Sequence, residues 1–176
     1  MKLGEKAPSF SLMGVDGETH TLESVKGSKA TIVVFSCNHC PYVVMSEDRL
    51  IAAFKDYAAK GVGMAAISSN DAADYPDDSF EEMKKRSSER GFPFPYLYDE
   101  SQSVARAYAA THTPHLFVFD KDLKLAYTGA VDDDSNYKTR KKVEKAYLRD
   151  ALDDLVAGRP VRVPETHAIG CTIKWK

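Results

Sequence analysis

The chain has 176 residues, of which 43% are hydrophobic and 28% are charged, and its formal net charge is −2 at pH 7. This composition suits one domain with a sizeable core, and the small net charge gives no reason to expect a nucleic acid or a membrane as a partner. No apolar run approaches the length of a membrane span. Residues 1–6 also lack the apolar core of a signal peptide. We therefore expect a cytoplasmic protein, whose cysteines are kept largely reduced.

The first half of the chain predicts a β-hairpin followed by a strand–helix–strand unit. The segments, in chain order, are a hairpin at 10–22, a helical turn at 22–27, a buried strand at 31–35, an amphipathic helix from 41 to about 60, and an apolar strand at 62–68. The hairpin turns at Gly14 and Gly17. A strand, a helix and a strand in this order imply a right-handed parallel crossover.

The second half predicts further helices and a second hairpin. The segments are a polar loop at 69–78, a helix at 79–90, a strand within 92–98, a helix at 101–110, hairpin strands at 116–119 and 125–128, a long helix at 136–157, and an extended tail at 158–176. Ser79 and Glu82 predict a capping box for the first of these helices, and Gly91 ends it. The fold class is therefore α/β, with residues 1–176 in a single domain and the tail packed on it.

The sequence Cys37-Asn38-His39-Cys40 joins the buried strand at 31–35 to the amphipathic helix. Free N–H groups and the helix dipole favour a thiolate at such a helix start. The spacing allows a disulfide to open and close with little backbone movement. We expect Cys37 to be the exposed nucleophile, Cys40 to resolve the mixed disulfide, and a charged His39 to lower the pKa of Cys37.

These features resemble those of the thioredoxin fold, and within it the redoxin branch, the peroxiredoxin-like proteins grouped with alkyl hydroperoxide reductases. Gly4-x-x-Ala7-Pro8-x-Phe10 and the long separation from the cysteines to Pro114 resemble the redoxin branch. The motifs similar to an uncharacterised subgroup of thioredoxin family proteins within it are Cys37-Asn38-His39-Cys40-Pro41, Ser69-Asn70-Asp71, Tyr75-Pro76-x-x-Ser79-Phe80 and Gly170-Cys171-x-Ile173-Lys174-Trp175. The resemblance implies a central mixed sheet flanked by helices, with an N-terminal hairpin and an inserted helix–strand segment. It also implies that Pro114 is cis and that Thr113 offers its backbone to an extended substrate.

The chain departs from both parent patterns at the positions that carry their chemistry. The proline and threonine that precede a peroxide-attacking cysteine are replaced by Ala30 and Val34 when they are counted from Cys37. The tryptophan that precedes the first cysteine of thioredoxin is Ser36 here, and the strand at 31–35 contains no acidic residue. Proton transfer during exchange must therefore use another group.

Three other residues are candidates for accessory roles. Asn70 and Asp71 follow the strand at 62–68, at the sheet edge where α/β proteins bind ligands, although such pairs also simply form turns. Cys171 is left over from the motif, and a tail long enough to cross the domain can bring it beside Cys37 as a second resolving thiol. An inert cysteine is the alternative.

We interpret the chain as a thiol–disulfide oxidoreductase in which Cys37 and Cys40 react, and Asn38, His39, Thr113 and Pro114 tune the pair or shape the substrate groove. Its expected partners are a disulfide-containing protein or a small thiol, and an electron donor such as the thioredoxin or glutathione system, with no cofactor or metal. One alternative is a thiol peroxidase. Another is a metal-binding or thiol-sensing protein that uses Cys37, His39 and Cys40.

Overall fold

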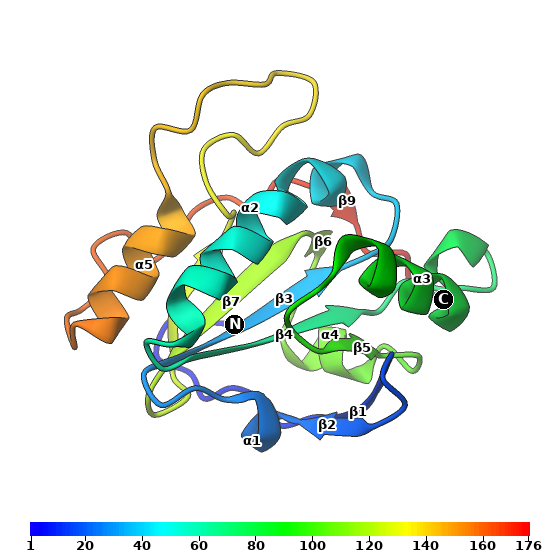
Figure 1. Ribbon diagram of the computed structural model, residues 1–176, viewed down its shortest axis with the longest axis horizontal. Coiled ribbons are helices and arrows are strands. Elements are labelled where there is room, and N and C mark those ends of the chain that lie inside the picture. The colour runs from blue at the N-terminus through cyan, green and yellow to red at the C-terminus, as the bar shows by residue number, and fades with distance from the viewer.

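A computed structural model describes residues 1–176 and contains a seven-stranded mixed sheet in the order β2-β1-β5-β4-β3-β7-β8 (Figure 1). The strands of this sheet are β1 (Ser11–Gly14), β2 (Thr19–Thr21), β3 (Ala30–Ser36), β4 (Val62–Ser68), β5 (Tyr96–Tyr98), β7 (His115–Asp120) and β8 (Leu125–Gly129). A separate two-stranded pair consists of β6 (His112–Thr113) and β9 (Cys171–Thr172). The helices are α1 (Leu22–Val25), α2 (Pro41–Ala58), α3 (Phe80–Arg90), α4 (Ser103–Ala107), α5 (Tyr147–Val156) and the 3₁₀ turn η1 (Pro76–Asp78).

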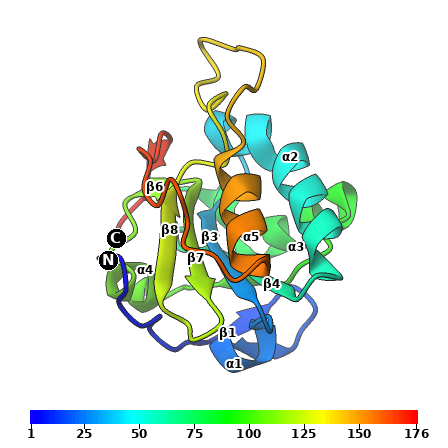
Figure 2. The ribbon, with the colours of Figure 1, turned by 90° about the vertical axis from the view of Figure 1, so that its left-hand side faces the viewer.

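The strand β3 is the centre of the sheet, and all seven of its residues are buried. It runs parallel to β4 and antiparallel to β7. Because successive side chains of a strand point to opposite faces, Ile32 and Val34 pack in a core beneath α2, α3 and α5. Val33 and Phe35 pack in a second core beneath α1 and α4. Figures 1 and 2 show these two helical layers on either side of the sheet.

Local sequence signals set the ends of several elements as predicted. Ser79 accepts a hydrogen bond from the backbone N–H of Glu82 and caps α3, and Gly91 ends this helix in the left-handed conformation that glycine adopts readily. The predicted hairpin and the strand–helix–strand unit are confirmed as β1–β2 and β3–α2–β4.

The predicted helix at 136–157 is wrong over its first part, because the helix begins only at Tyr147. Residues 131–146 form an irregular excursion that projects beyond the rest of the molecule (Figure 2). The carboxylates of Asp133 and Asp134 accept the backbone N–H groups of Glu144 and Lys141. Side-chain bonds of this kind compete with the helical hydrogen-bond pattern, so hydrophobic spacing alone did not decide the structure here.

The tail leaves α5 and follows β8, where the backbone of Thr128 exchanges hydrogen bonds with Pro164 and Thr166. It then crosses to the carboxyl end of β3, and β9 pairs there with β6. The sequence predicted an extended tail, and this short strand pair is an addition to that prediction. None of the helices combines the length and the apolar character that crossing a membrane requires.

Candidate active site

Cys37 follows the end of β3, and Cys40 is the N-cap residue of α2. Pro41 begins the helix at a position where its missing N–H costs nothing. Both cysteines are reduced, and their exposed fractions are 1% for Cys37 and 3% for Cys40. The prediction that Cys37 is the more exposed thiol is therefore wrong, since the surrounding segments cover both sulfur atoms.

Thr113 lies against the thiol pair, and Pro114 follows it in the chain. The peptide bond between them is cis. The hydroxyl oxygen of Thr113 is 3.7 Å from the sulfur of Cys37, and its carbonyl oxygen is 3.4 Å from the sulfur of Cys40. One residue therefore contacts both thiols, from the strand that precedes β7.

Asp78 lies at the centre of the polar contacts around the motif, although the sequence analysis did not single it out. Its side chain is fully buried. One carboxylate oxygen accepts the backbone N–H of Asn38 at 2.9 Å and the Nδ1 of His39 at 3.1 Å. The other accepts the side-chain amide of Asn70 at 2.9 Å. The 3₁₀ turn η1 thus brings a buried negative charge to the Cys-x-x-Cys turn.

Asn38 holds this turn in place from the inside. Its side-chain amide donates to the carbonyl of Asp77 at 2.8 Å, and its side-chain oxygen accepts the buried hydroxyl of Tyr96 at 2.8 Å. His39 is the more solvent-accessible member of the motif, with 43% of its side chain exposed, and its ring contacts the carboxylate of Asp78. Asn38 is therefore a structural anchor, whereas His39 is placed at the surface.

The contacts distribute the protons of the thiols unevenly. The pKa of Cys37 is raised because its S–H donates to Cys40, because it is buried, and because it faces the charge of Asp78. The pKa of Cys40 is lowered because it accepts that hydrogen bond and further ones from the N–H groups of Val43 and Cys171. These pKa directions favour the thiolate on Cys40 over Cys37, whereas the sequence had predicted it on Cys37.

The tail supplies the third thiol, and Asn70 and Asp71 hold that tail. The side-chain oxygen of Asn70 accepts the backbone N–H of Lys174 at 2.9 Å, and the backbone N–H of Asp71 donates to the Lys174 carbonyl at 2.7 Å. Cys171 packs against the cluster that Cys37, Cys40 and Val43 form. Its role as a second resolving thiol stays a prediction.

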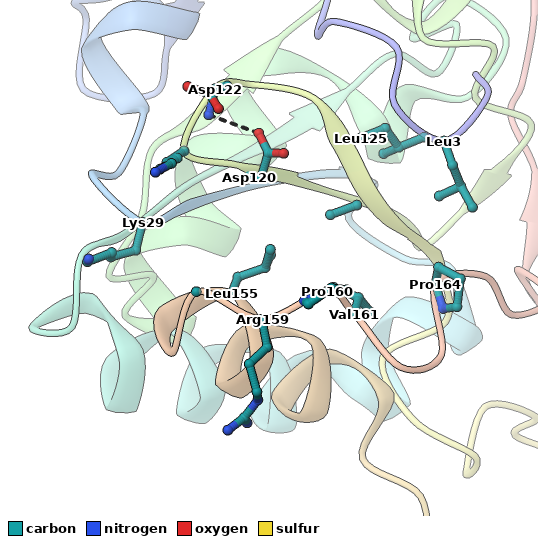
Figure 3. Close-up of a pocket in the computed structure, with 13 residues that line it drawn as sticks. Leu3, Lys29, Asp120, Asp122, Leu125, Leu155, Arg159, Pro160, Val161 and Pro164 are labelled. Carbon is teal, nitrogen blue, oxygen red and sulfur yellow. Dashed lines mark hydrogen bonds between the residues drawn. The ribbon is translucent and has the colours of Figure 1, made fainter.

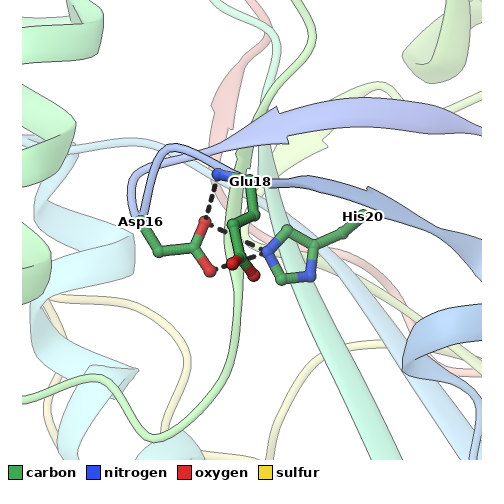
Figure 4. Close-up of side chains that lie close together, drawn as sticks. All are labelled: Asp16, Glu18 and His20. Atoms are coloured by element: carbon green, nitrogen blue, oxygen red, sulfur yellow. Dashed lines mark hydrogen bonds and ion pairs between the residues drawn. The ribbon is translucent and has the colours of Figure 1, made fainter.

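Cys37, His39 and Cys40 do not converge as a set of metal ligands. Among residues 1–176, a three-residue set of potential ligand atoms within 4.8 Å of one another is formed by Asp16, Glu18 and His20 on the exposed hairpin (Figure 4). There the carboxylate of Asp16 accepts the backbone N–H of Glu18 and faces the ring of His20. These contacts account for the cluster as part of the β1–β2 turn.

A polar groove of about 240 Å³ lies beside the motif. Asn38 and His39 form one wall of it, and charged side chains of α3, among them Lys85 and Arg86, form another. The groove contains no hydrophobic side chain. It therefore suits a small charged molecule better than an apolar peptide.

The profile of the family described as Redoxin matches residues 2–147. The chain belongs to the redoxin family. It is also similar to the thiol-disulfide oxidoreductase ResA of Bacillus anthracis, with 25% identity over 125 residues that span 71% of this chain and 68% of that protein.

Two solved structures resemble this redoxin to different degrees. An uncharacterized conserved protein from Geobacillus kaustophilus is 49% identical, with a TM-score of 0.95, and the match covers 99% of this chain and 93% of that one. The thioredoxin domain of a thiol-disulfide oxidoreductase from Bacteroides vulgatus is 20% identical, with a TM-score of 0.63, and the match covers 74% and 89% of the two chains. The likeness to this domain shows that the fold is thioredoxin-like.

Proposed function

We propose that this redoxin is a thiol–disulfide oxidoreductase that exchanges the dithiol of Cys37 and Cys40 with external disulfides. The observation that carries the proposal is a pair of free thiols at the start of α2, both within reach of Thr113: its hydroxyl oxygen is 3.7 Å from the sulfur of Cys37, and its carbonyl oxygen is 3.4 Å from that of Cys40. The pKa directions, raised for Cys37 and lowered for Cys40, support it. Sharing a proton between adjacent thiols stabilises a thiolate, and the thiolate is the nucleophile in disulfide exchange. The likeness to ResA, whose name describes this activity, supports the same conclusion.

The uneven proton distribution suggests an order of attack. The Cys40 thiolate attacks one sulfur of an external disulfide, forms a mixed disulfide, and releases the other half as a thiolate. Cys37 then gives up its proton and attacks the sulfur of Cys40, which releases the second half and closes the Cys37–Cys40 disulfide. The sequence alone predicts the reverse order, with Cys37 attacking first.

The substrate in this proposal is a small disulfide or a protein disulfide, and the oxidised enzyme is restored by a thiol donor such as the glutathione or thioredoxin system. Glutathione is the probe of choice because it is a small disulfide when oxidised. The groove beside His39 is lined by charges of both signs, and its two cations, Lys85 and Arg86, already pair with Glu82 and Glu47.

Trapping of mixed disulfides tests the proposal. Two variants that each retain one thiol of the pair, Cys37→Ser/Cys171→Ser and Cys40→Ser/Cys171→Ser, are mixed with oxidised glutathione and analysed by intact mass. We expect rapid glutathionylation of the first variant at Cys40 and slow reaction of the second. The opposite result would restore the order predicted from the sequence.

A second measurement tests the reaction class with the wild-type chain. The reduced protein is mixed with one equivalent of oxidised glutathione or of hydrogen peroxide, quenched with acid after seconds, freed of small molecules, and its remaining protein thiols are counted. Because exchange turns oxidised glutathione into two free thiols, only the protein thiols are informative. Loss of two protein thiols with the disulfide supports exchange. Rapid loss with peroxide alone would contradict our proposal and identify a peroxidase, and no loss with either reagent would exclude both activities.

A further inference from the structure

The strand β9 occupies the backbone edge of Thr113. Cys171 is paired antiparallel with Thr113, and Thr172 with His112. Gly170 passes so close that a Cβ atom at this position would lie 2.1 Å from the carbonyl oxygen of Thr113. The tail therefore adopts, within the same chain, the extended conformation that an external strand would need in order to pair beside the cis-proline.

Contacts beyond β9 fix the tail in this position. Ile173 is 3% exposed, and its backbone N–H donates to the carbonyl of Thr111 at 3.0 Å. The side chain of Gln102 donates to the Lys174 carbonyl at 3.0 Å and accepts the backbone N–H of Lys176 at 3.1 Å. This set of bonds, together with those from Asn70 and Asp71, makes the tail an integral part of the site.

The third thiol lies at the same place as the other two. Cys171 packs against the cluster that Cys37, Cys40 and Val43 form. It is also paired with Thr113, whose carbonyl oxygen is 3.4 Å from the sulfur of Cys40. Burial and the neighbouring Cys40 raise the pKa of Cys171 to about 11, so this thiol keeps its proton at neutral pH.

We propose that Cys171 is a third redox-active thiol, which forms a disulfide with Cys40 as an alternative to the Cys37–Cys40 disulfide. The tail then takes the place beside Thr113 that an external substrate strand would take. This inference deepens the proposed exchange function and rests on it for the reactivity of Cys40.

The chemistry needs no oxidant beyond a disulfide. When the Cys37–Cys40 disulfide is present, the sulfur of Cys171 loses its proton and attacks the sulfur of Cys40. The Cys40–Cys171 bond forms, the Cys37–Cys40 bond breaks, and Cys37 leaves as a thiolate that takes up the proton. The number of disulfides is unchanged, so the step is an internal isomerisation.

A disulfide between Cys40 and Cys171 would also lock β9 against Thr113. In that form the Thr113 edge is closed to any external strand, while the sulfur of Cys37 is released as a free thiol. The two disulfides would therefore differ in which partners the enzyme can accept.

The experiment uses the full-length Cys37→Ser chain, with Cys37→Ser/Cys171→Ser as its matched control. Each is equilibrated in a glutathione redox buffer, quenched with acid, and analysed by intact mass and by peptide mapping without reduction. Because tethered groups have effective concentrations in the millimolar range or above, we expect Cys40–Cys171 to exceed the glutathione adduct by about tenfold or more in a buffer of about 0.1 mM reduced glutathione. The control can form only the glutathione adduct.

Two results would overturn the inference. In the first, Cys37→Ser accumulates the glutathione adduct to the same extent as the control. In the second, Cys37→Ser keeps both remaining thiols free while the control is glutathionylated. The proposed function is judged separately, by the wild-type thiol titration. If the wild-type chain exchanges with the external disulfide but Cys37→Ser forms no Cys40–Cys171 disulfide, only the proposed role of Cys171 is wrong. A Cys40–Cys171 linkage in Cys37→Ser, beside a wild-type chain that forms no Cys37–Cys40 disulfide, would remove only the proposed function.

Discussion

The two ends of β3 differ in the space they enclose and in the chemistry they hold. At its amino end, a cavity of about 440 Å³ lies between the β7–β8 turn and the end of α5 (Figure 3). At its carboxyl end, the spaces beside Val43 and Pro114 measure only about 10 Å³, and the polar groove beside His39 measures about 240 Å³. Yet the three thiols and the buried carboxylate lie at this closed end, about 20 Å from the cavity along the seven residues of the strand.

Cavity volume is therefore a poor guide to the reactive site of this protein. A large, well-formed pocket is the usual first hypothesis for a binding site. Here the thiols are kept out of solvent by β9 and by Thr113, so their reactivity must depend on movement of the tail. The cavity near Lys29 and Arg159 carries no nucleophile and is lined by residues from the strand turn and the start of the tail.

The largest contrast between the two ends should appear in the pH dependence of alkylation. The pKa of Cys40 is lowered to about 4, so its thiolate should persist as the pH falls and be lost only near that value. At about pH 5, less than about a thousandth of an ordinary thiol of pKa about 8.5 is ionised. We expect iodoacetamide to alkylate the reduced protein at nearly the same rate between about pH 7 and pH 5.

The matched control for this profile places a cysteine at the cavity end. Ala126→Cys in a chain whose native cysteines are all serine should lose alkylation rate about tenfold per pH unit over the same range. Parallel profiles for the two proteins would show that Cys40 is not activated.

A substitution in the tail should break the closure of the thiol end. Gly170→Val must displace β9, because the added Cβ meets the backbone of Thr113. Overpacking typically costs about 1–3 kcal/mol, so we expect alkylation of the native thiols to become about tenfold to a hundredfold faster through local opening. Gly158→Ala at the cavity end is the control for destabilisation away from the tail: its φ of 72° strains any side chain, while no atom lies within 4 Å of its added Cβ. Equal rates for both variants would argue against gating by the tail.

The thiol end also contains a histidine that should make folding stability depend on pH. Burial lowers the pKa of His115 to about 4, and its Nδ1 accepts the backbone N–H of Thr111. The unfolded chain therefore binds this proton near pH 6.5 and the folded chain does not, so stability falls as the pH drops from about 6.5 towards 4. We expect a loss of about 2 kcal/mol between about pH 7 and pH 5.

Urea unfolding of the wild type and of His115→Gln at the two pH values measures this loss. The His115→Gln variant should lack most of the loss of unfolding free energy between the two pH values. It should be less stable than the wild type at neutral pH, because the stacking of His115 on Phe117 is removed. If the unfolding free energy of His115→Gln depends on pH as strongly as that of the wild type, other groups cause the effect.

The smallest effect concerns Asp78, whose charge faces Cys37. In the Cys40→Ser/Cys171→Ser background, Asp78→Asn should lower the pKa of Cys37, because a nearby negative charge disfavours the thiolate. An interaction on the order of 1 kcal/mol corresponds to roughly fivefold more thiolate at a given pH. Ultraviolet titration of the thiolate measures this, with the exposed neighbour Asp77→Asn as control. An unchanged titration curve would mean that Asp78 serves only to anchor Asn38 and His39.

The sequence sufficed where short-range patterns decide the structure. The run of β-branched residues at 31–35, the Cys-x-x-Cys and the amphipathic helix are contiguous, so their arrangement follows from local periodicity and capping. The position of Pro114 came from the family resemblance and lies where that resemblance implied.

Long-range contacts account for what the sequence did not reveal. Asp78 is 40 residues from Asn38 in the chain, and nothing in its local sequence distinguishes it from Asp71 or Asp77 in the same polar loop. The exposure of Cys37 was misjudged because the segment that covers the pair comes from the far end of the chain. Residues 136–146 were misjudged because the carboxylates of Asp133 and Asp134 bind the backbone in place of a helix.

The tail contains the single tryptophan of the protein, Trp175, whose ring lies 4.5 Å from the guanidinium of Arg106 on α4. An indole beside a cation changes its emission when it moves into water. The chain therefore contains an intrinsic optical probe of tail docking, which needs no label and leaves all three thiols untouched. Stopped-flow fluorescence can follow release of the tail in the same sample, and on the same timescale, as the disappearance of free thiols.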